Sequence, residues 1–274
     1  MKNDFKLNKL LVTHLNPDLD ACVAIWIFKK FIFRKEEYFL EFVPLGKKLL
    51  QSKDFKEHEI IYIDTSGGKY DHHNSSEYIC AASLVMYEYS LEGNLAIKRM
   101  VDYTLAVDHG QIIDSVIDDF SIVDVIDGLN TLYPENPKLV MKKVLSYLDA
   151  IYKNLQTMIG AESDFEKVQE FETKWGKGAG IISSNPKIRY IAYKKGYKIF
   201  VFVDPTNGFR GFTAPGSAEI DLGSLYIKLR KIEPNAHWFL HSSKKLLLCG
   251  SLKAQNKKLS KLSLEQMINF VKKS

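Results

Sequence analysis

The sequence predicts an α/β protein, with a doubly wound, mainly parallel sheet in an N-terminal domain, a helical connector and a smaller α+β C-terminal domain. Three observations lead to this prediction. Short apolar runs near residues 10 and 60 each stop on ionisable side chains, as buried parallel strands do at their carboxyl edge. Apolar residues at helical spacing occupy the middle of the chain. From residue 178 onward, short apolar runs alternate with glycine-containing turns.

The composition fits a globular protein with a sizeable core: 274 residues, 46% hydrophobic and 26% charged, with a formal net charge of +5. This mild basic excess permits an anionic substrate, and its scatter along the chain argues against a stable nucleic-acid partner. The three cysteines form no CxxC pair, which favours reduced thiols. No apolar segment reaches the length of a signal peptide or a membrane span, so we expect a soluble, cytoplasmic protein that has no membrane partner.

The first apolar run, around residue 10, ends in a loop that carries three ionisable side chains. The run stops at His14, and an Asn-Pro turn then leads to Asp18 and Asp20. One of the two acids can cap the helix that we expect over residues 19–33. Capping does not account for a histidine and two aspartates on one loop, so the loop is a candidate metal site.

The stretch from Ile60 to Asn74 (IIYIDTSGGKYDHHN) holds the densest chemistry of the chain. Its apolar run ends on Asp64, and a turn with two glycines leads to Asp71, His72 and His73. Ligands of open α/β sheets bind at the carboxyl edge of the strands, where this cluster is expected to lie. Carboxylates and imidazoles this close together predict a metal site rather than an ordinary polar loop.

Together these motifs resemble a known superfamily. The segment Thr13–Ala21 (THLNPDLDA), the strand-end Asp64 and the triplet Asp71–His73 resemble the first three motifs of the DHH phosphoesterases. That superfamily includes RecJ-type exonucleases, small-RNA and cyclic-dinucleotide phosphodiesterases and family II inorganic pyrophosphatases. The resemblance covers roughly the first 110 residues, and the order and spacing of the motifs are specific. For the aspartate of the fourth motif we prefer Asp108, and Asp102 is the alternative.

The resemblance implies a centre of two divalent metal ions, with Mn²⁺ preferred and Mg²⁺ or Co²⁺ as alternatives. It implies that one ion is held by His14 and Asp18, the other by Asp20, His72 and Asp108, and that Asp64 bridges both. It assigns catalytic roles to His73, as a donor to the substrate phosphate, and to Asp71, which supports the loop. Candidate substrate contacts are Asn16, His109, Arg210, His241, Lys244 and Ser251.

The remaining elements follow from periodicity and turn signals. We expect a strand over Phe39–Val43 and helices over Ile79–Leu91, Leu95–Leu105, Ile112–Ile126, Lys138–Met158 and Asp164–Trp175, with an interruption at Gly160. A hairpin of Ile188–Tyr193 with Tyr197–Val203, a helix over Leu222–Lys231, a hairpin of Trp238–Leu240 with Leu246–Leu248, and a capped helix over Ser263–Lys272 complete the prediction. The predicted domains are therefore 1–175, the DHH-type metal-binding catalytic domain with its connector, and 176–274, the substrate-recognition domain.

The C-terminal domain departs from the superfamily pattern. Its glycine-rich GGGH motif is absent, and Leu248–Ser251 stands in its place, which argues against close kinship with the RecJ and small-RNA branches. Ser243–Lys245 is a faint echo of the basic motif of the pyrophosphatase branch. We expect a Mn/Mg-dependent phosphoesterase that hydrolyses a phosphodiester or phosphoanhydride of a small phosphorylated molecule or short oligonucleotide. The alternatives are a non-hydrolytic, metal-dependent protein that binds a phosphorylated ligand and an inorganic pyrophosphatase; a homodimer is compatible with each.

Overall fold

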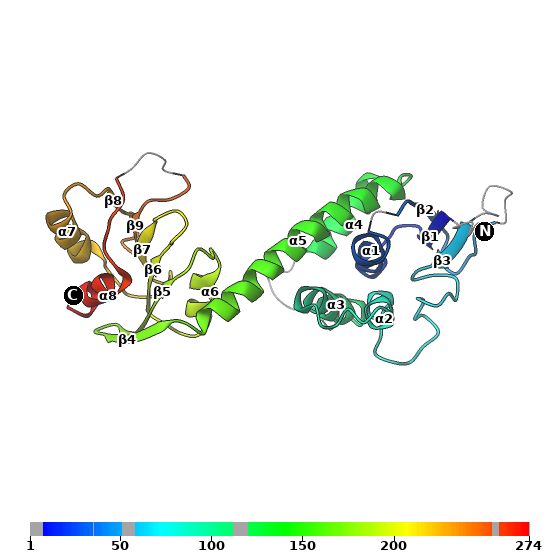
Figure 1. Cartoon of the computed structure of the whole chain (residues 1–274). Coiled ribbons are helices and arrows are strands. Elements are labelled where there is room, and N and C mark those ends of the chain that lie inside the picture. The colour runs from blue at the N-terminus through cyan, green and yellow to red at the C-terminus, as the bar shows by residue number, and fades with distance from the viewer. Residues whose placement is uncertain (1–7, 35, 51–57, 112–119, 254–257, 274) are drawn as a thin grey trace, which may run out of the picture. The chain divides into compact units, whose positions relative to one another are not determined.

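The structure is a computed structural model that describes residues 8–34, 36–50, 58–111, 120–253 and 258–273. The chain divides into two compact units, Met1–Gln156 and Thr157–Ser274. Figure 1 shows one sheet in each unit, β1 to β3 in blue and cyan and β4 to β9 in green to red. The division falls earlier than the predicted boundary after residue 175, because β4 (Gln169–Thr173) pairs within the second sheet.

The first unit contains a three-stranded parallel sheet in the order β2-β1-β3. Its strands are β1 (Asn8–His14), β2 (Tyr38–Val43) and β3 (His58–Tyr62). Residues 10–12 of β1, at the centre of the sheet, are fully buried. All three predicted N-terminal strands are therefore confirmed, and their parallel pairing brings the loops that follow β1 and β3 to the same edge.

Helices of the first unit pack around the first one, α1. They are α1 (Leu19–Ile27), which continues as the π-helix η1 (Phe28–Phe33), α2 (Ala81–Glu88), α3 (Leu95–Asp108), α4 (Ile122–Leu132) and the start of α5 (Pro137–Phe165). Every residue of α1 is buried, because α2, α3 and α4 all contact it. Of the helix predicted over 112–126, residues 112–119 lie outside the described part of the chain, and α4 begins at Ile122.

The second unit contains a six-stranded mixed sheet in the order β4-β5-β6-β7-β9-β8. Its further strands are β5 (Gly176–Ile182), β6 (Ile199–Val203), β7 (Arg210–Thr213), β8 (Trp238–Leu240) and β9 (Leu246–Cys249), and its helices are α6 (Ile188–Lys194), α7 (Gly223–Ile232) and α8 (Leu264–Lys272). Only β5 and β6 run parallel; the other neighbours are antiparallel. The hairpin of β8 and β9 and the capping box of Ser263 with Gln266 on α8 are confirmed.

Two predicted elements of this half are wrong. The helix predicted over Asp164–Trp175 does not form, because α5 runs through Gly160 to Phe165 and β4 follows. A single glycine costs a helix about 1 kcal/mol, which a long, packed helix tolerates. The segment predicted as the first strand of a hairpin is helix α6, whose residues Ile188, Ile191 and Ala192 are buried at helical spacing.

Two further observations concern the whole described chain. All three cysteines are buried as free thiols. Within the described ranges, no helix combines the length and the apolar character that crossing a membrane requires.

Candidate metal centre

The centre is built first from the ends of β1 and β3. His14 is the last residue of β1, and Asp64 follows β3 after one residue; both side chains are buried. The Nε2 atom of His14 lies 3.1 Å from Oδ2 of Asp64, and its Nδ1 lies 2.8 Å from the carbonyl oxygen of Leu15. When Nδ1–H donates to that carbonyl, a neutral ring presents the lone pair of Nε2 toward the centre, as a metal ligand must.

The loop after β1 adds two aspartates with different partners. Asp18 caps α1 by accepting a hydrogen bond from the backbone N–H of Ala21, and its other oxygen lies 3.9 Å from Nε2 of His14. Asp20 is 2% exposed, and its two oxygens accept hydrogen bonds from the backbone N–H groups of Ala81 and Ala82 at the start of α2. The first amides of a helix attract the oxygens of a carboxylate, so α2 holds the Asp20 side chain in place at the centre.

The loop after β3 needs an unusual backbone. Asp64 has a φ of 53°, and Gly68 lies so close to Tyr62 that a Cβ on it would meet the Cβ atom of Tyr62 at 2.6 Å. Asp71 fastens the loop, because its carboxylate accepts hydrogen bonds from the backbone N–H groups of Gly67 and His73. The same carboxylate lies 2.7 Å from Nδ1 of His73, so it orients that ring as well.

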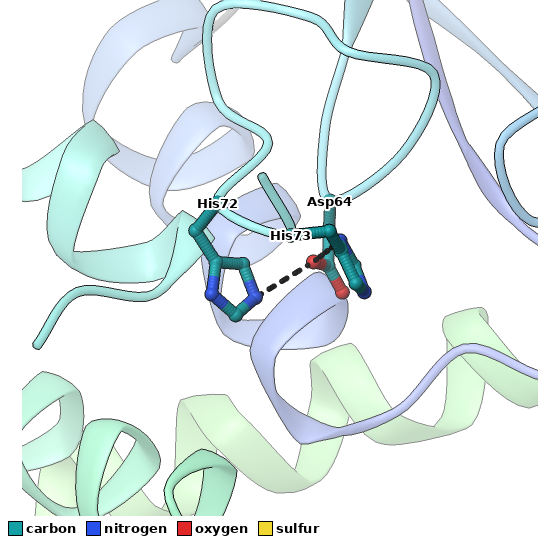
Figure 2. A group of neighbouring side chains, drawn as sticks. All are labelled: Asp64, His72 and His73. Atoms are coloured by element: carbon teal, nitrogen blue, oxygen red, sulfur yellow. Dashed lines mark ion pairs between the residues drawn. The ribbon is translucent and has the colours of Figure 1, made fainter. Parts of the chain in front are cut away.

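Both histidines of the triplet face Asp64, as Figure 2 shows. Oδ1 of Asp64 lies 3.3 Å from Nε2 of His72 and 3.6 Å from Nδ1 of His73. Neither Asp64 Oδ1 nor His72 Nε2 has a hydrogen-bond partner within the part of the chain that the structure describes, although both atoms are buried. Buried polar atoms are nearly always paired in folded proteins, so these two unpartnered atoms fit a cation between them.

Asp108, the aspartate that we preferred for the fourth motif, is the last residue of α3. Its Oδ2 lies 3.6 Å from Nδ1 of His72, whose Nε2 lies 3.6 Å from Oδ2 of Asp20. The alternative, Asp102, is exposed on α3 and forms an ion pair with Lys98 one turn earlier. The structure therefore brings Asp108, and not Asp102, to the other candidate ligands.

Among the described residues, three groups of side chains offer ligand atoms that lie within 4.8 Å of one another. They are His14 with Asp18 and Asp64, Asp20 with His72 and Asp108, and Asp64 with His72 and His73. All six side chains predicted as metal ligands belong to these groups. Asp64 belongs to the first and third groups but not to the second, and its contact with that second group is with His72.

Burial and the neighbouring charged groups shift the pKa values of the carboxylates and imidazoles of the centre. Burial, helped by the negative charge of Asp64, raises the pKa of Asp20 to about 7, and burial also raises the pKa of Asp108. Burial raises the pKa of Asp64 too, but the His14 and His72 imidazoles outweigh it and hold that pKa below its usual value. Contact with Asp64 raises the pKa of His72 to about 9, whereas for His14 the same carboxylate must overcome burial to reach about 9. The carboxylates thus draw positive charge to the centre.

Two predicted substrate contacts lie at the border of this cluster. Asn16 is exposed and adopts a left-handed φ of 52°, which asparagine tolerates better than most residues. His109 ends α3; its Nε2 lies 3.0 Å from the carbonyl oxygen of Ile79 and 3.8 Å from Oδ2 of Asp108, and its ring is 4.4 Å from that of Tyr78. His109 therefore lies beside the candidate ligand Asp108, and Asn16 lies in the loop between His14 and Asp18.

The other four predicted contacts belong to the second unit. Arg210 begins β7, and its guanidinium donates to the carbonyl oxygens of Leu262 and Gly208, so it holds backbone together. Lys244 forms an ion pair with Asp221 at 2.8 Å. His241 lies in the turn between β8 and β9, and Ser251 is half-buried just after β9.

Sequence reasoning missed the backbone groups that fix the ligands. The amides of Ala81 and Ala82 hold Asp20, and Nδ2 of Asn130 on α4 donates to the carbonyl oxygen of Pro17. A backbone amide can belong to any residue type, so the sequence motifs do not reveal which amides bind Asp20. Asn130 lies far from the loop in sequence, so its contact with Pro17 could not be predicted from the motifs either.

No protein-family model matches the chain, and no curated protein matches it either. The geometry around Asp64 therefore carries the functional inference.

Proposed function

We propose that the protein is a metal-dependent phosphoesterase that hydrolyses a phosphodiester or phosphoanhydride bond. The substrate class is a small phosphorylated molecule or a short oligonucleotide. The observation that carries this proposal is the buried Oδ1 atom of Asp64, which has no hydrogen-bond partner among the described residues and faces two imidazoles. An isolated buried carboxylate oxygen is costly, whereas a bound cation would satisfy it.

The donor set fits two divalent ions. His14 and Asp18 would hold one ion, Asp20, His72 and Asp108 the other, and Asp64 would contact both. Carboxylates outnumber imidazoles, which suits Mn²⁺ with Mg²⁺ or Co²⁺ as alternatives. When bound, such ions activate a water molecule and offset the charge that develops on a phosphoryl group.

His73 and Asp71 supply the proton chemistry of the proposal. His73 is the most exposed of the clustered histidines, with 44% of its side chain accessible, so a substrate can reach it. Burial raises the pKa of Asp71, but its bonds to His73 and to the amide of Gly67 outweigh this and keep it ionised. Asp71 holds Nδ1 of His73, which directs Nε2 to the opposite side of the ring, where it can donate to a phosphate oxygen.

The proposal includes several further expectations about the fold, the location and the partners of the protein. They are the doubly wound arrangement of the first sheet, the substrate-recognising role of the second unit, a cytoplasmic location, the absence of a stable nucleic-acid or membrane partner, and compatibility with a homodimer. Each rests on the sequence patterns and the resemblance given above.

A hydrolysis panel tests the proposal. Purified protein is supplied with Mn²⁺, Mg²⁺ or Co²⁺ and with bis-p-nitrophenyl phosphate, pyrophosphate, a short RNA or cyclic dinucleotides. We expect turnover that Asp64→Ala abolishes and that His73→Ala lowers by about 100-fold at unchanged metal stoichiometry. Asp102 is an exposed acid on α3, the helix that carries Asp108. Its variant Asp102→Asn serves as the matched control and is expected to keep full activity.

The outcomes separate the candidate functions. Release of phosphate from pyrophosphate alone would identify a pyrophosphatase. Silence across the panel, with two ions still bound, would contradict an enzyme and favour a protein that binds a phosphorylated ligand without cleaving it.

A further inference from the structure

A reciprocal pair of side-chain contacts joins the chain just before α2 to the chain just after α3. From the first segment, the hydroxyl of Tyr78 donates a hydrogen bond to Oε1 of Gln111 at 2.7 Å. From the second segment, Nε2 of His109 lies 3.0 Å from the carbonyl oxygen of Ile79. A carbonyl oxygen can only accept, so this nitrogen carries a hydrogen and donates it. Each segment therefore holds the other, and we call these four residues the α2–α3 clasp.

The end of α3 presents two of the clasp residues on a fixed backbone. Gly110 has a φ of 65°, and its N–H donates to the carbonyl oxygen of Val107. The N–H of Gln111 donates to the carbonyl oxygen of Ala106 at 2.8 Å. This pair of bonds is a Schellman motif, which favours glycine at the residue in the left-handed region. The motif therefore fixes the backbone that carries His109 and Gln111.

The clasp lies between two carboxylates that belong to the same group of candidate ligands. On one side, Asp108 directly precedes His109, whose Nε2 lies 3.8 Å from Oδ2 of Asp108. On the other side, the first amides of α2, which begins shortly after Ile79, hold both oxygens of Asp20. Asp20 and Asp108 share their ligand group with His72. The clasp therefore ties together the segments that position these two carboxylates.

Burial in the core does not explain the clasp. Tyr78 is 49% exposed, and His109 and Gln111 are exposed as well. The Tyr78 and His109 rings lie 4.4 Å apart, so they also pack against each other. None of the ligand groups found among the described residues includes His109. Water could satisfy each of these polar groups at the surface, so the main effect of the bonds is on the geometry of the two segments.

We propose that the α2–α3 clasp positions the ligands of one ion, the one that Asp20, His72 and Asp108 would hold. The inference rests on the proposed function and deepens it, because it makes this ion depend on residues that are not its ligands. A divalent ion needs its carboxylates at metal–oxygen distances, and a start of α2 that could move away from α3 would widen the site. His109, a candidate substrate contact from the sequence, is then a positioning residue.

Manganese binding to the full chain tests the inference without relying on hydrolysis. Isothermal titration with Mn²⁺ gives the affinity of each ion, and electron paramagnetic resonance distinguishes two coupled ions from a single one. In His109→Ala we expect one of the two ions to bind about tenfold more weakly, as is typical when a partner outside the ligand shell is lost. His109→Gln places an amide N–H near the position of Nε2 and is expected to restore most of that affinity.

Variants of the ligands identify the ion that depends on the clasp. We expect His109→Ala to have its full effect in the Asp18→Asn background, which weakens the other ligand group. In the Asp108→Asn background we expect no further effect, because two changes at one site are not additive.

A milder change removes only one bond of the clasp. Tyr78→Phe loses the hydroxyl that Gln111 accepts from, and it should weaken the same ion by less than His109→Ala does. Its matched control is Tyr87→Phe, an exposed tyrosine near the other end of α2, which should change neither affinity.

The outcomes separate this inference from the proposed function. Equal weakening of both ions in His109→Ala, or no restoration in His109→Gln, would overturn the clasp. Unchanged Mn²⁺ affinities in a His109→Ala chain that has lost turnover would overturn the clasp and leave the phosphoesterase standing. Selective weakening of one ion, in a chain that hydrolyses nothing in the panel, would support the clasp and refute the phosphoesterase.

Discussion

Two buried aspartates follow strands of the two sheets, and their partners differ in kind. Asp64 comes after β3 and is 1% exposed; Asp204 comes directly after β6 and is 9% exposed. Around Asp204, the hydroxyl of Ser184 and the backbone N–H of Thr206 donate to one oxygen, and Nδ2 of Asn207 donates to the other. Around Asp64 stand imidazoles, and one carboxylate oxygen has no hydrogen-bond partner among the described residues.

The difference shows that an acid at a strand end does not by itself indicate a metal site. Burial raises the pKa of Asp204, but its hydrogen bonds to Ser184 and Asn207 outweigh this and keep the pKa below its usual value. Its lone pairs are used by N–H and O–H donors, so it organises a turn. Asp64 instead meets groups that can themselves offer lone pairs, which is the arrangement that a cation requires.

The largest effect is expected from removing the charge of Asp64. Asp64→Asn keeps the shape of the side chain but should lower metal affinity by more than about 100-fold, since even partners outside the ligand shell contribute 10- to 100-fold. Dialysis against Mn²⁺ followed by elemental analysis measures the bound ions. We expect the loss of both ions, because Asp64 lies beside His14 of one proposed ligand set and beside His72 of the other.

Asp204→Asn is the matched control for that experiment. It removes the same charge from the other buried strand-end aspartate and is expected to leave metal stoichiometry unchanged. Full stoichiometry in Asp64→Asn would refute the bridging role, and loss of metal in Asp204→Asn would show that the comparison rests on general destabilisation.

A smaller effect is expected from the glycines of the two loops. In Gly68→Ala, the new methyl carbon would lie 2.6 Å from the Cβ atom of Tyr62 and 3.1 Å from the carbonyl oxygen of Tyr62. The loop that carries the two histidines must therefore shift. We expect metal affinity to fall about tenfold. Gly208→Ala, in the loop after Asp204, strains a φ of 72° and should cost about 1–2 kcal/mol of stability without affecting metal binding. Equal metal affinities in the two variants would contradict the role of the Gly68 contact.

Much of the candidate centre follows from the sequence, because the chemistry is local and the topology is simple. Parallel strands that are neighbours end at one edge, so His14 and Asp64 had to approach each other once β1 and β3 paired. From the sequence we preferred Asp108, with Asp102 as the alternative. The decision comes from the length of α3, which extends to Asp108 and brings it to His72.

The second unit was harder to predict because packing overrides local pattern there. Strand β5 contains Gly178 and Gly180, which weaken any strand signal. Both are glycine because neighbours pack against the backbone: a Cβ on Gly178 would meet the Phe171 ring at 2.4 Å, and one on Gly180 would meet Ile268 at 2.7 Å. These neighbours come from β4 and α8, so the reason for the two glycines in β5 is visible only in the folded structure.

The smallest expected effect is a pH dependence of the stability that the Asp204 carboxylate contributes. A carboxylate whose pKa is lowered by folding adds stability above its ordinary value of 3.8 and loses that contribution as the pH falls through the folded pKa. Asp204→Asn should therefore lower the free energy of unfolding by about 1–2 kcal/mol at pH 7 and by much less at pH 3. Urea unfolding of the full chain, followed by tryptophan fluorescence, measures the difference, and two of the three tryptophans, Trp175 and Trp238, lie in the second unit. Titrations of other groups cancel between the two proteins, so an equal difference at both pH values would mean that the ionised carboxylate does not hold this turn.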